Sequence, residues 1–131
     1  MRAHLRDVLA EAAEAASLAV LSRLAATSVW RDARVVALYS DLPGEVPTEG
    51  LIRAAREKGA RVVLPRVSGT GEMFFAELGM GSERVRGRFG VLEPAAAMPA
   101  VALAEIDLFV VPGLAFDRSG GRLGRGAGYY C

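Results

Sequence analysis

Two short apolar runs, separated by a segment with helical spacing, constrain the fold of this chain more than any other feature. RVVALY at residues 34–39 and RVVL at residues 61–64 are rich in β-branched residues, and the second run is closed by Pro65. Such runs predict buried strands. The segment between them has an N-cap residue at Thr48 and a helix stop at Gly59. The order strand, helix, strand predicts a right-handed parallel βαβ unit.

Further segments extend this unit into one layered structure. Residues 3–26 repeat alanine, leucine and valine at three- and four-residue steps, which predicts an amphipathic helix. MFFAEL at 73–78 and DLFVV at 107–111 predict two more strands, and the second is the strongest in the chain. The Gly- and Arg-rich stretch 79–90 predicts an irregular connection. Since the chain has no internal repeat and no linker composition, residues 1–131 are expected to form one α/β domain, with an open, mostly parallel sheet flanked by helices.

Composition narrows the class of function. The chain has 131 residues, of which 52% are hydrophobic and 24% charged, as is typical of a globular protein. A formal net charge of +1 gives no case for a nucleic-acid or membrane partner. No stretch has the ~20 consecutive apolar residues of a membrane span, and no signal-peptide pattern is present. The single cysteine, Cys131, excludes an internal disulfide, so we expect a cytoplasmic protein that is a monomer or a weak homo-oligomer.

The segment VVPGLAFDRSGGRLGRGAGYY, residues 110–130, carries most of the candidate chemistry. It leaves the carboxyl end of a predicted strand, where ligands bind in open α/β sheets. Its five glycines from position 120 to 128 allow backbone N–H groups to turn toward an anion. Arg122 and Arg125 add charge-assisted donors, and Tyr129 and Tyr130 add aromatic faces. These residues predict a phosphate cradle. A purely structural glycine loop stays open at about even odds, because the spacing matches neither of the usual nucleotide motifs.

The same segment closely resembles the signature of the 5-formyltetrahydrofolate cyclo-ligases, also called methenyltetrahydrofolate synthetases. In that family V-P-G-x-A-F-D leads into R-L-G-x-G-x-G-Y-Y-D. Four more elements resemble the family in the right order: GEVPT around Glu45, LPR at 64–66, MF at 73–74 and GRFGVLEP at 87–94. The resemblance covers roughly residues 17–130. It implies an α/β fold similar to the ribose-5-phosphate isomerase and CoA-transferase-like folds.

The resemblance also implies a reaction. ATP phosphorylates the formyl oxygen of 5-formyltetrahydrofolate, the neighbouring nitrogen closes the ring, and phosphate leaves to give 5,10-methenyltetrahydrofolate; Mg²⁺ and ATP are the implied cofactor and co-substrate. Such a protein must hold the γ-phosphate in line and neutralise its charge. The implied catalytic residues are Arg122, Arg125 and Tyr129. The implied ATP-binding residues are Arg2, Arg6, Arg122, Leu123, Gly124, Arg125, Gly126, Ala127, Gly128, Tyr129 and Tyr130. The implied folate-binding residues are Ser40, Glu45, Phe74, Arg125 and Tyr129.

The chain departs from the family pattern in several places. Cys131 stands where the family has a magnesium-site Asp, and because a thiol is a poor ligand for a hard cation, no metal ligand is predicted. The segment between Arg6 and Ser17 is shorter than in the family, Ala127 replaces the usual Gly or Lys, and family members continue past position 131, so a truncated member is expected. An alternative is an inactive relative or fragment that binds folate, a nucleotide or a partner protein. A phosphate-ester enzyme of the related isomerase folds rests on fold analogy alone.

Structural roles compete with functional roles at several of these residues. An isolated loop glutamate such as Glu45 is usually solvated, and Phe74 is more often a core residue than a ligand wall. Glu93, before a proline, is expected to hold a turn. Asp117 is expected to anchor the glycine loop by accepting backbone N–H bonds rather than to act in catalysis.

Overall fold

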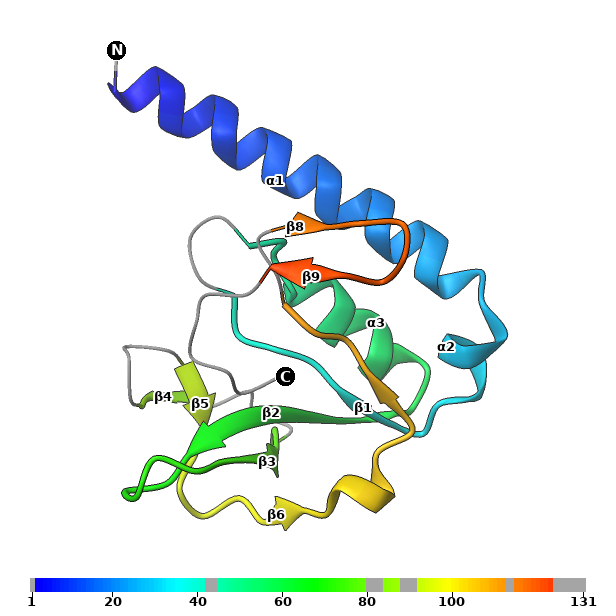
Figure 1. Cartoon of the computed structure of the whole chain (residues 1–131), viewed down its shortest axis with the longest axis vertical. Coiled ribbons are helices and arrows are strands. Elements are labelled where there is room, and N and C mark those ends of the chain that lie inside the picture. Colours follow the sequence, from blue (N-terminus) through cyan, green and yellow to red (C-terminus); the bar gives the residue numbers. More distant parts are fainter. Residues whose placement is uncertain (1, 42–44, 80–83, 88–91, 113–114, 124–131) are drawn as a thin grey trace.

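The computed structural model describes residues 2–41, 45–79, 84–87, 92–112 and 115–123 (Figure 1). Its elements, in chain order, are α1 (Arg2–Ala25), α2 (Ser28–Asp32), β1 (Val35–Ala37), α3 (Glu49–Glu57), β2 (Arg61–Val67), β3 (Met73–Glu77), β4 (Arg84–Arg86), β5 (Leu92–Pro94), β6 (Ala100–Val101), a 3₁₀ turn (Leu103–Glu105), β7 (Leu108–Phe109), β8 (Ala115–Phe116) and β9 (Arg122–Leu123).

The predicted βαβ unit is confirmed. β1 and β2 pair in parallel from Val35↔Arg61 to Ala37↔Val63, and α3 connects them. The helix stops where predicted, since Gly59 takes a φ of +84° that an L side chain rarely adopts. The proposed cap is wrong in its mechanism, because Thr48 precedes the helix but its side chain caps no backbone N–H.

β2 is longer than predicted and runs through Pro65. The odd-numbered residues of β2 direct their backbone N–H and C=O groups toward β1, as the hydrogen bonds from Arg61 N to Arg34 O and from Leu38 N to Val63 O show. The backbone nitrogen of Pro65 therefore points toward β1, but it carries no N–H to donate, and the last parallel pair is at Val63. Pairing with β3 continues on the other side of the strand to Val67. Proline ends the parallel ladder here without ending the strand.

The five strands of the main sheet are ordered β6-β3-β2-β1-β7. β1 pairs in parallel with β2 and β7, while β3 pairs antiparallel with β2 and β6. The predicted α/β fold class is thus confirmed. The strand expected over residues 107–111 is only Leu108–Phe109, because β1, its single partner, contributes just Val36 and Ala37 to the pairing. The segment predicted to be the strongest strand is therefore a short strand at the edge of the sheet.

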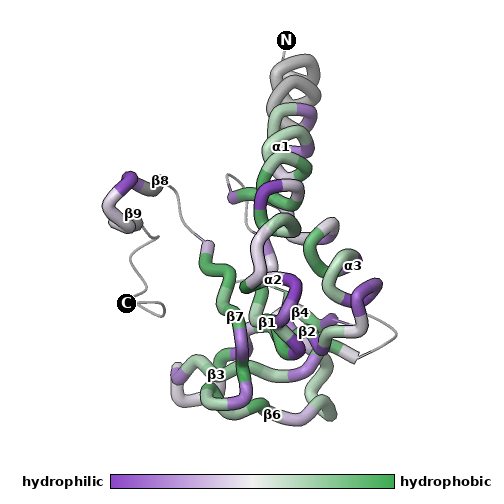
Figure 2. The backbone as a smooth tube through the Cα atoms, turned by 90° about the vertical axis from the view of Figure 1, so that its right-hand side faces the viewer, coloured by the Kyte–Doolittle hydropathy of each residue, from purple (hydrophilic) through white to green (hydrophobic). Residues whose placement is uncertain are grey.

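The helices pack on one face of the sheet, and β8 and β9 lie on the opposite side of it (Figure 2). One buried cluster joins these helices to the even positions of β1 and β2: Trp30, Ala33, Val36, Leu38, Leu51, Ile52, Ala55, Val62, Leu64 and Leu78. The odd positions of the two strands belong to a second cluster on the other face: Val35, Ala37, Val63, Phe75, Val101 and Ile106. Burial on both faces explains why the strands read as continuous apolar runs.

The helix over residues 3–26 is confirmed, but its amphipathic stripe is only partly used. Leu21 and Leu24 pack against the helix-side core, whereas Val20, which belongs to the predicted stripe, is exposed. The reason is visible in Figure 1, where only the C-terminal part of α1 reaches the rest of the fold.

Two small hairpins lie outside the main sheet. β4 pairs with β5 from Arg84↔Pro94 to Arg86↔Leu92, so the prediction of an irregular connection over 79–90 is wrong for residues 84–86. Pattern reading misses this strand because Val85 is its single apolar residue. β8 pairs with β9 through Ala115↔Leu123 and Phe116↔Arg122.

Candidate functional site

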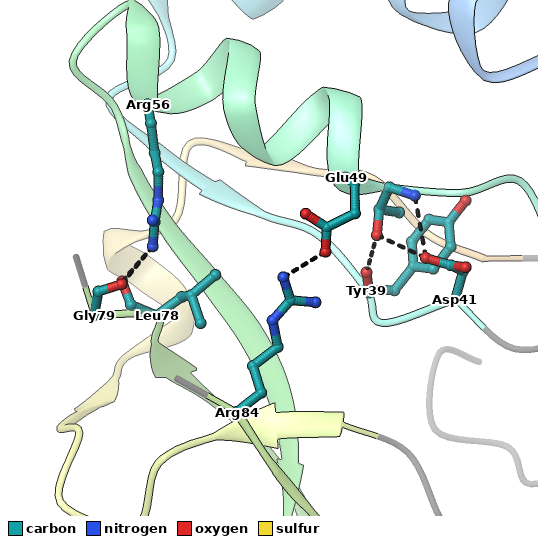
Figure 3. A network of polar contacts seen from close by, with 8 residues as sticks. Tyr39, Asp41, Glu49, Arg56, Leu78, Gly79 and Arg84 are labelled. Carbon is teal, nitrogen blue, oxygen red and sulfur yellow. Dashed lines mark hydrogen bonds and ion pairs between the residues drawn. The ribbon is translucent and has the colours of Figure 1, made fainter. Parts of the chain in front are cut away.

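A polar loop follows the carboxyl end of β1 and returns to the start of α3. We call its described residues, 39–41 and 45–48, the Glu45 loop. The Thr48 hydroxyl donates to the Tyr39 carbonyl oxygen at 2.7 Å and lies 3.2 Å from Asp41 Oδ1 (Figure 3). The Thr48 backbone N–H also donates to Asp41 Oδ1, at 3.2 Å. Thr48 thus ties both ends of the loop together. Its side chain caps no helix N–H, and its backbone lies in the αR region rather than in the extended region typical of a capping residue.

The Glu45 loop contains two buried residues with ionisable side chains, Glu45 and Tyr39. Glu45 is 9% exposed, so the expectation of a solvated loop glutamate is wrong. Burial raises the pKa of Tyr39 to about 12, and the charges of Glu45 and Asp41 act in the same direction. The neutral Tyr39 hydroxyl donates to the Val46 carbonyl oxygen at 2.8 Å. A buried carboxylate is an acceptor that a ligand with N–H donors can use.

Ser40 adds a second buried polar group at this edge of the sheet. Among the residues that the structure describes, the Ser40 Oγ is the buried side-chain polar atom with no hydrogen-bond partner. An unsatisfied buried hydroxyl costs about 1–3 kcal/mol, so its presence calls for an explanation. A ligand that hydrogen-bonds to Oγ supplies one.

Helix α1 supports the loop from the outside. The Ser17 hydroxyl donates to the Pro47 carbonyl oxygen at 2.9 Å. A side chain added at Gly50 would contact Leu21 and Ser17, both at 3.9 Å, so α1 and α3 lie close together here. Sequence reasoning did not find the roles of Ser17, Thr48 and Tyr39, since nothing in the local pattern distinguishes them from ordinary helix and strand residues.

Phe74 lies at the same edge of the sheet as Ser40. Ser40 is three residues past Ala37, and Arg66 is three residues past Val63, the parallel partner of Ala37. Phe74 pairs with Arg66 across the β2–β3 ladder. The Arg66 guanidinium lies 5.9 Å from the Phe74 ring centre and donates to the Met98 carbonyl oxygen at 3.3 Å. Phe74 is half-buried and is therefore not a core residue.

Glu93 is a structural residue, as expected, but it lies in strand β5 and holds β5 to β2 rather than holding a turn. It is 6% exposed, and its Oε2 accepts a hydrogen bond from the Val67 backbone N–H at 3.0 Å. Gly87 leaves the space that the Glu93 carboxyl group occupies, since a Cβ there would overlap it. The described residues of the GRFGVLEP element, Gly87 and Glu93 among them, thus attach β5 to the end of β2.

The expected anchor of the glycine loop is also confirmed. Asp117 Oδ1 accepts backbone N–H bonds from Ser119 at 2.8 Å and from Gly121 at 2.7 Å. Gly120 has a φ of +90°, which favours glycine, and a Cβ at Gly121 would overlap the Asp117 carboxylate. These contacts form the turn between β8 and β9.

The structure places the remaining candidate residues as follows. Arg122 and Leu123 form β9, which Figure 2 shows apart from the sheet and from α1. Arg2 and Arg6 belong to the end of α1 that points away from the sheet (Figure 1). Of the predicted folate-binding residues that the structure describes, Ser40 and Phe74 lie at the same end of the sheet, and Glu45 lies in the loop that follows Ser40. Outside the described residues lie Gly124, Arg125, Gly126, Ala127, Gly128, Tyr129, Tyr130 and Cys131.

No metal cage is found within the described ranges, where no three His, Cys, Asp or Glu side chains cluster so as to hold an ion. Of the described helices, none is both long and apolar enough to cross a membrane.

The fold and these residues define an α/β protein with a candidate ligand site at the carboxyl end of a parallel pair of strands. A model of the 5-formyltetrahydrofolate cyclo-ligase family matches residues 1–131. This chain therefore belongs to the 5-formyltetrahydrofolate cyclo-ligase family.

Individual relatives agree with this assignment. The chain is 39% identical over 102 residues to the 5-formyltetrahydrofolate cyclo-ligase of Mycolicibacterium smegmatis, covering 74% of this chain and 53% of that protein. It is 35% identical over 101 residues to the Escherichia coli K12 cyclo-ligase, covering 75% and 56%. The solved structure of Aquifex aeolicus 5,10-methenyltetrahydrofolate synthetase superimposes with a TM-score of 0.74 at 33% identity, covering 87% of this chain and 57% of that one. The chain thus spans little more than half the length of these relatives.

Proposed function

We propose that this chain converts 5-formyltetrahydrofolate to 5,10-methenyltetrahydrofolate at the expense of ATP, with release of ADP and phosphate. Family membership supports the reaction class. The single structural observation that carries the proposal is the burial of Glu45 in a loop that Thr48 closes at the carboxyl end of β1. A cytoplasmic location and a monomeric or weakly associating state belong to the same proposal.

The folate binds at the Glu45 edge. The pterin ring of a reduced folate presents neighbouring N–H donors, and a carboxylate accepts two such bonds side by side. Glu45 takes this role in the proposal because it is an acidic residue buried at this end of the sheet. The Ser40 Oγ supplies a further hydrogen bond. Phe74, half-buried at the same edge, offers an apolar face to the ring system.

The nucleotide half of the proposal rests on the segment from Arg122 to Tyr130. The formyl oxygen attacks the γ-phosphorus of ATP and ADP leaves. The neighbouring folate nitrogen then attacks the formyl carbon, and the carbon–oxygen bond breaks to release phosphate. Arg122 and Arg125 neutralise the charge of the transferred phosphoryl group and Tyr129 donates a hydrogen bond to it, with Arg2 and Arg6 as further phosphate ligands. Mg²⁺ enters the proposal through the family's ATP dependence alone, and no step is assigned to it.

The test is the formation of methenyl product, followed by absorbance, with purified chain, MgATP and 5-formyltetrahydrofolate. Reactions without ATP or without protein are the controls. Product that needs both supports the proposal. Glu45→Gln should reduce turnover at fixed folate, whereas Glu105→Gln, which alters an exposed glutamate away from this edge, should not. A folded chain that gives no product refutes the proposed reaction.

A second candidate is a relative that binds folate, a nucleotide or a partner protein without turnover. The observation that favours it is the position of β9, which carries Arg122 on the hairpin that Figure 2 shows apart from the sheet. Calorimetric binding of 5-formyltetrahydrofolate that is weakened by Glu45→Gln, together with no product, would establish this candidate in place of the first.

A further inference from the structure

Helix α3 presents a polar side as well as an apolar one. Leu51, Ile52 and Ala55 are buried against the sheet. Glu49 and Arg56 are seven residues apart, two helical turns, and so lie one above the other on the same side of the helix. Both are engaged by the part of the chain that follows β3, as Figure 3 shows.

These two contacts hold the chain on either side of the connection between β3 and β4. The Arg56 guanidinium donates to the carbonyl oxygens of Leu78 at 3.2 Å and Gly79 at 2.5 Å. Arg84 Nη2, from β4, lies 2.5 Å from Glu49 Oε1. The Arg84 side chain is only 14% exposed, whereas that of Glu49 is 62% exposed. Arg84 is thus the shielded partner, and it extends from the β4–β5 hairpin to the first residue of α3.

The first residue of α3 is also the neighbour of the residue that closes the Glu45 loop. Glu49 follows Thr48, whose hydroxyl and N–H bind the Tyr39 carbonyl oxygen and Asp41. A shift of the Glu49 backbone is transmitted to Thr48 through one peptide bond. The contact between Arg84 and Glu49 therefore connects the β4–β5 hairpin to the loop that buries Glu45.

We propose that Arg84 is a positioning residue for the folate site: by pairing with Glu49 it fixes the start of α3, and with it Thr48 and the Glu45 loop. The role in folate affinity rests on the proposed function. Arg84 is assigned no contact with the substrate. Arg84 acts on the site through Glu49 and Thr48. Its effect can therefore be measured separately from the effect of changing Glu45.

The chain offers a matched control. Arg61 and Glu77 form a second Arg–Glu pair, with 2.8 Å between Nε and Oε1, between β2 and β3. Arg61 is the first residue of β2, at the edge of the sheet opposite to Phe74 and Ser40. Arg61→Met therefore removes the same kind of pair at a place that does not contact the Glu45 loop.

The experiment measures two quantities in the full chain: the dissociation constant of 5-formyltetrahydrofolate by calorimetry, and amide hydrogen exchange over residues 45–52. Arg84→Met should raise the dissociation constant about three- to ten-fold and lower protection over these residues. Glu49→Gln should act in the same way. The double variant should be no worse than the weaker-binding single variant, because both substitutions break one contact. Arg61→Met should leave both quantities within about twofold of the parent chain.

The outcomes separate this inference from the proposed function. If the parent chain binds no folate, the proposed function fails, and exchange alone decides the inference. Protection lost in Arg84→Met but kept in Arg61→Met then supports it, and equal protection overturns it. If the parent chain binds folate, an unchanged dissociation constant in Arg84→Met overturns the inference, as does an equal loss in Arg61→Met.

Discussion

A methyl group added at Gly87 would occupy the space of the Glu93 carboxyl group. Gly87→Ala is therefore a direct test of the role assigned to the GRFGVLEP element. Glu93 is 6% exposed and accepts a hydrogen bond from Val67 N at 3.0 Å. A Cβ at position 87 overlaps the carboxyl carbon and both oxygens of that side chain. The carboxyl group must shift, and we expect this shift to weaken or break its bond to Val67.

The size of the effect follows from the bond and the burial. A hydrogen bond to a charged group contributes about 1.5–3 kcal/mol. Replacing glycine by alanine lowers the entropy of the unfolded chain, which returns about 0.4–1 kcal/mol. The expected net loss of unfolding free energy is thus roughly 1–2 kcal/mol. Gly69→Ala is the control, because a Cβ at Gly69 contacts nothing within 4 Å.

Urea unfolding followed by tryptophan fluorescence measures this loss. Trp30, the single tryptophan, is 4% exposed and reports on the helix-side core. In a Glu93→Ala background the cost of Gly87→Ala should disappear, because the overlapping group is gone. The reasoning is refuted if Gly87→Ala is as stable as Gly69→Ala, or if its cost persists without the Glu93 side chain.

Three further predictions follow from the structure. Lys58→Met should lower the unfolding free energy by about 1–3 kcal/mol in the same assay, because the Lys58 ammonium donates to the carbonyl oxygens of Trp30, Arg31 and Ala33 at the end of α2; an unchanged midpoint would contradict this role. Hydrogen bonds from the backbone N–H groups of Arg34 and Val35 lower the pKa of Asp107 below its ordinary value of 3.8. Its contribution to the stability of the fold is therefore present above pH 3.8 and is lost as the pH falls through the lowered pKa. The unfolding free energy of the parent chain should therefore fall more steeply with acid than that of Asp107→Asn. Parallel pH curves for the two proteins would show that Asp107 does not stabilise the fold in this way. Glu45→Gln should weaken folate binding while sparing ATP, and Arg122→Ala should do the reverse; calorimetry with each ligand distinguishes them, and the same loss for both ligands would refute the division of the site.

The main elements could be predicted because their signals are local. The β-branched runs, the Gly59 stop and the order of segments are sufficient to predict β1, α3, β2 and their parallel pairing. Helix α1 could be predicted from propensity and spacing. The exposure of Val20 could not, because the spacing of apolar residues does not say how far the rest of the fold extends along a helix. β4 carries a single apolar residue and therefore has no strand pattern to detect.

The candidate site divides in the same way. Family motifs pointed to Ser40, Glu45 and Phe74, and the structure places Ser40 and Phe74 at one end of the sheet, with Glu45 in the loop that follows Ser40. The supporting contacts could not be predicted, since Ser17 reaches Pro47 over 30 residues and Arg84 reaches Glu49 over 35. Whether a glutamate is buried depends on such partners, so the expectation of a solvated Glu45 was wrong for a reason that no local pattern contains.

By itself the sequence determined the class of fold, the family and the identity of the residues that carry its motifs. These depend on covalent order, backbone propensity and the spacing of side chains, which are properties of short segments. Only the tertiary structure decided that Glu45 is buried, that Thr48 closes its loop instead of capping α3, and that Glu93 braces β5 against Val67. Each of these depends on contacts that extend beyond a short segment, and packing selects among such partners only when the whole fold is formed.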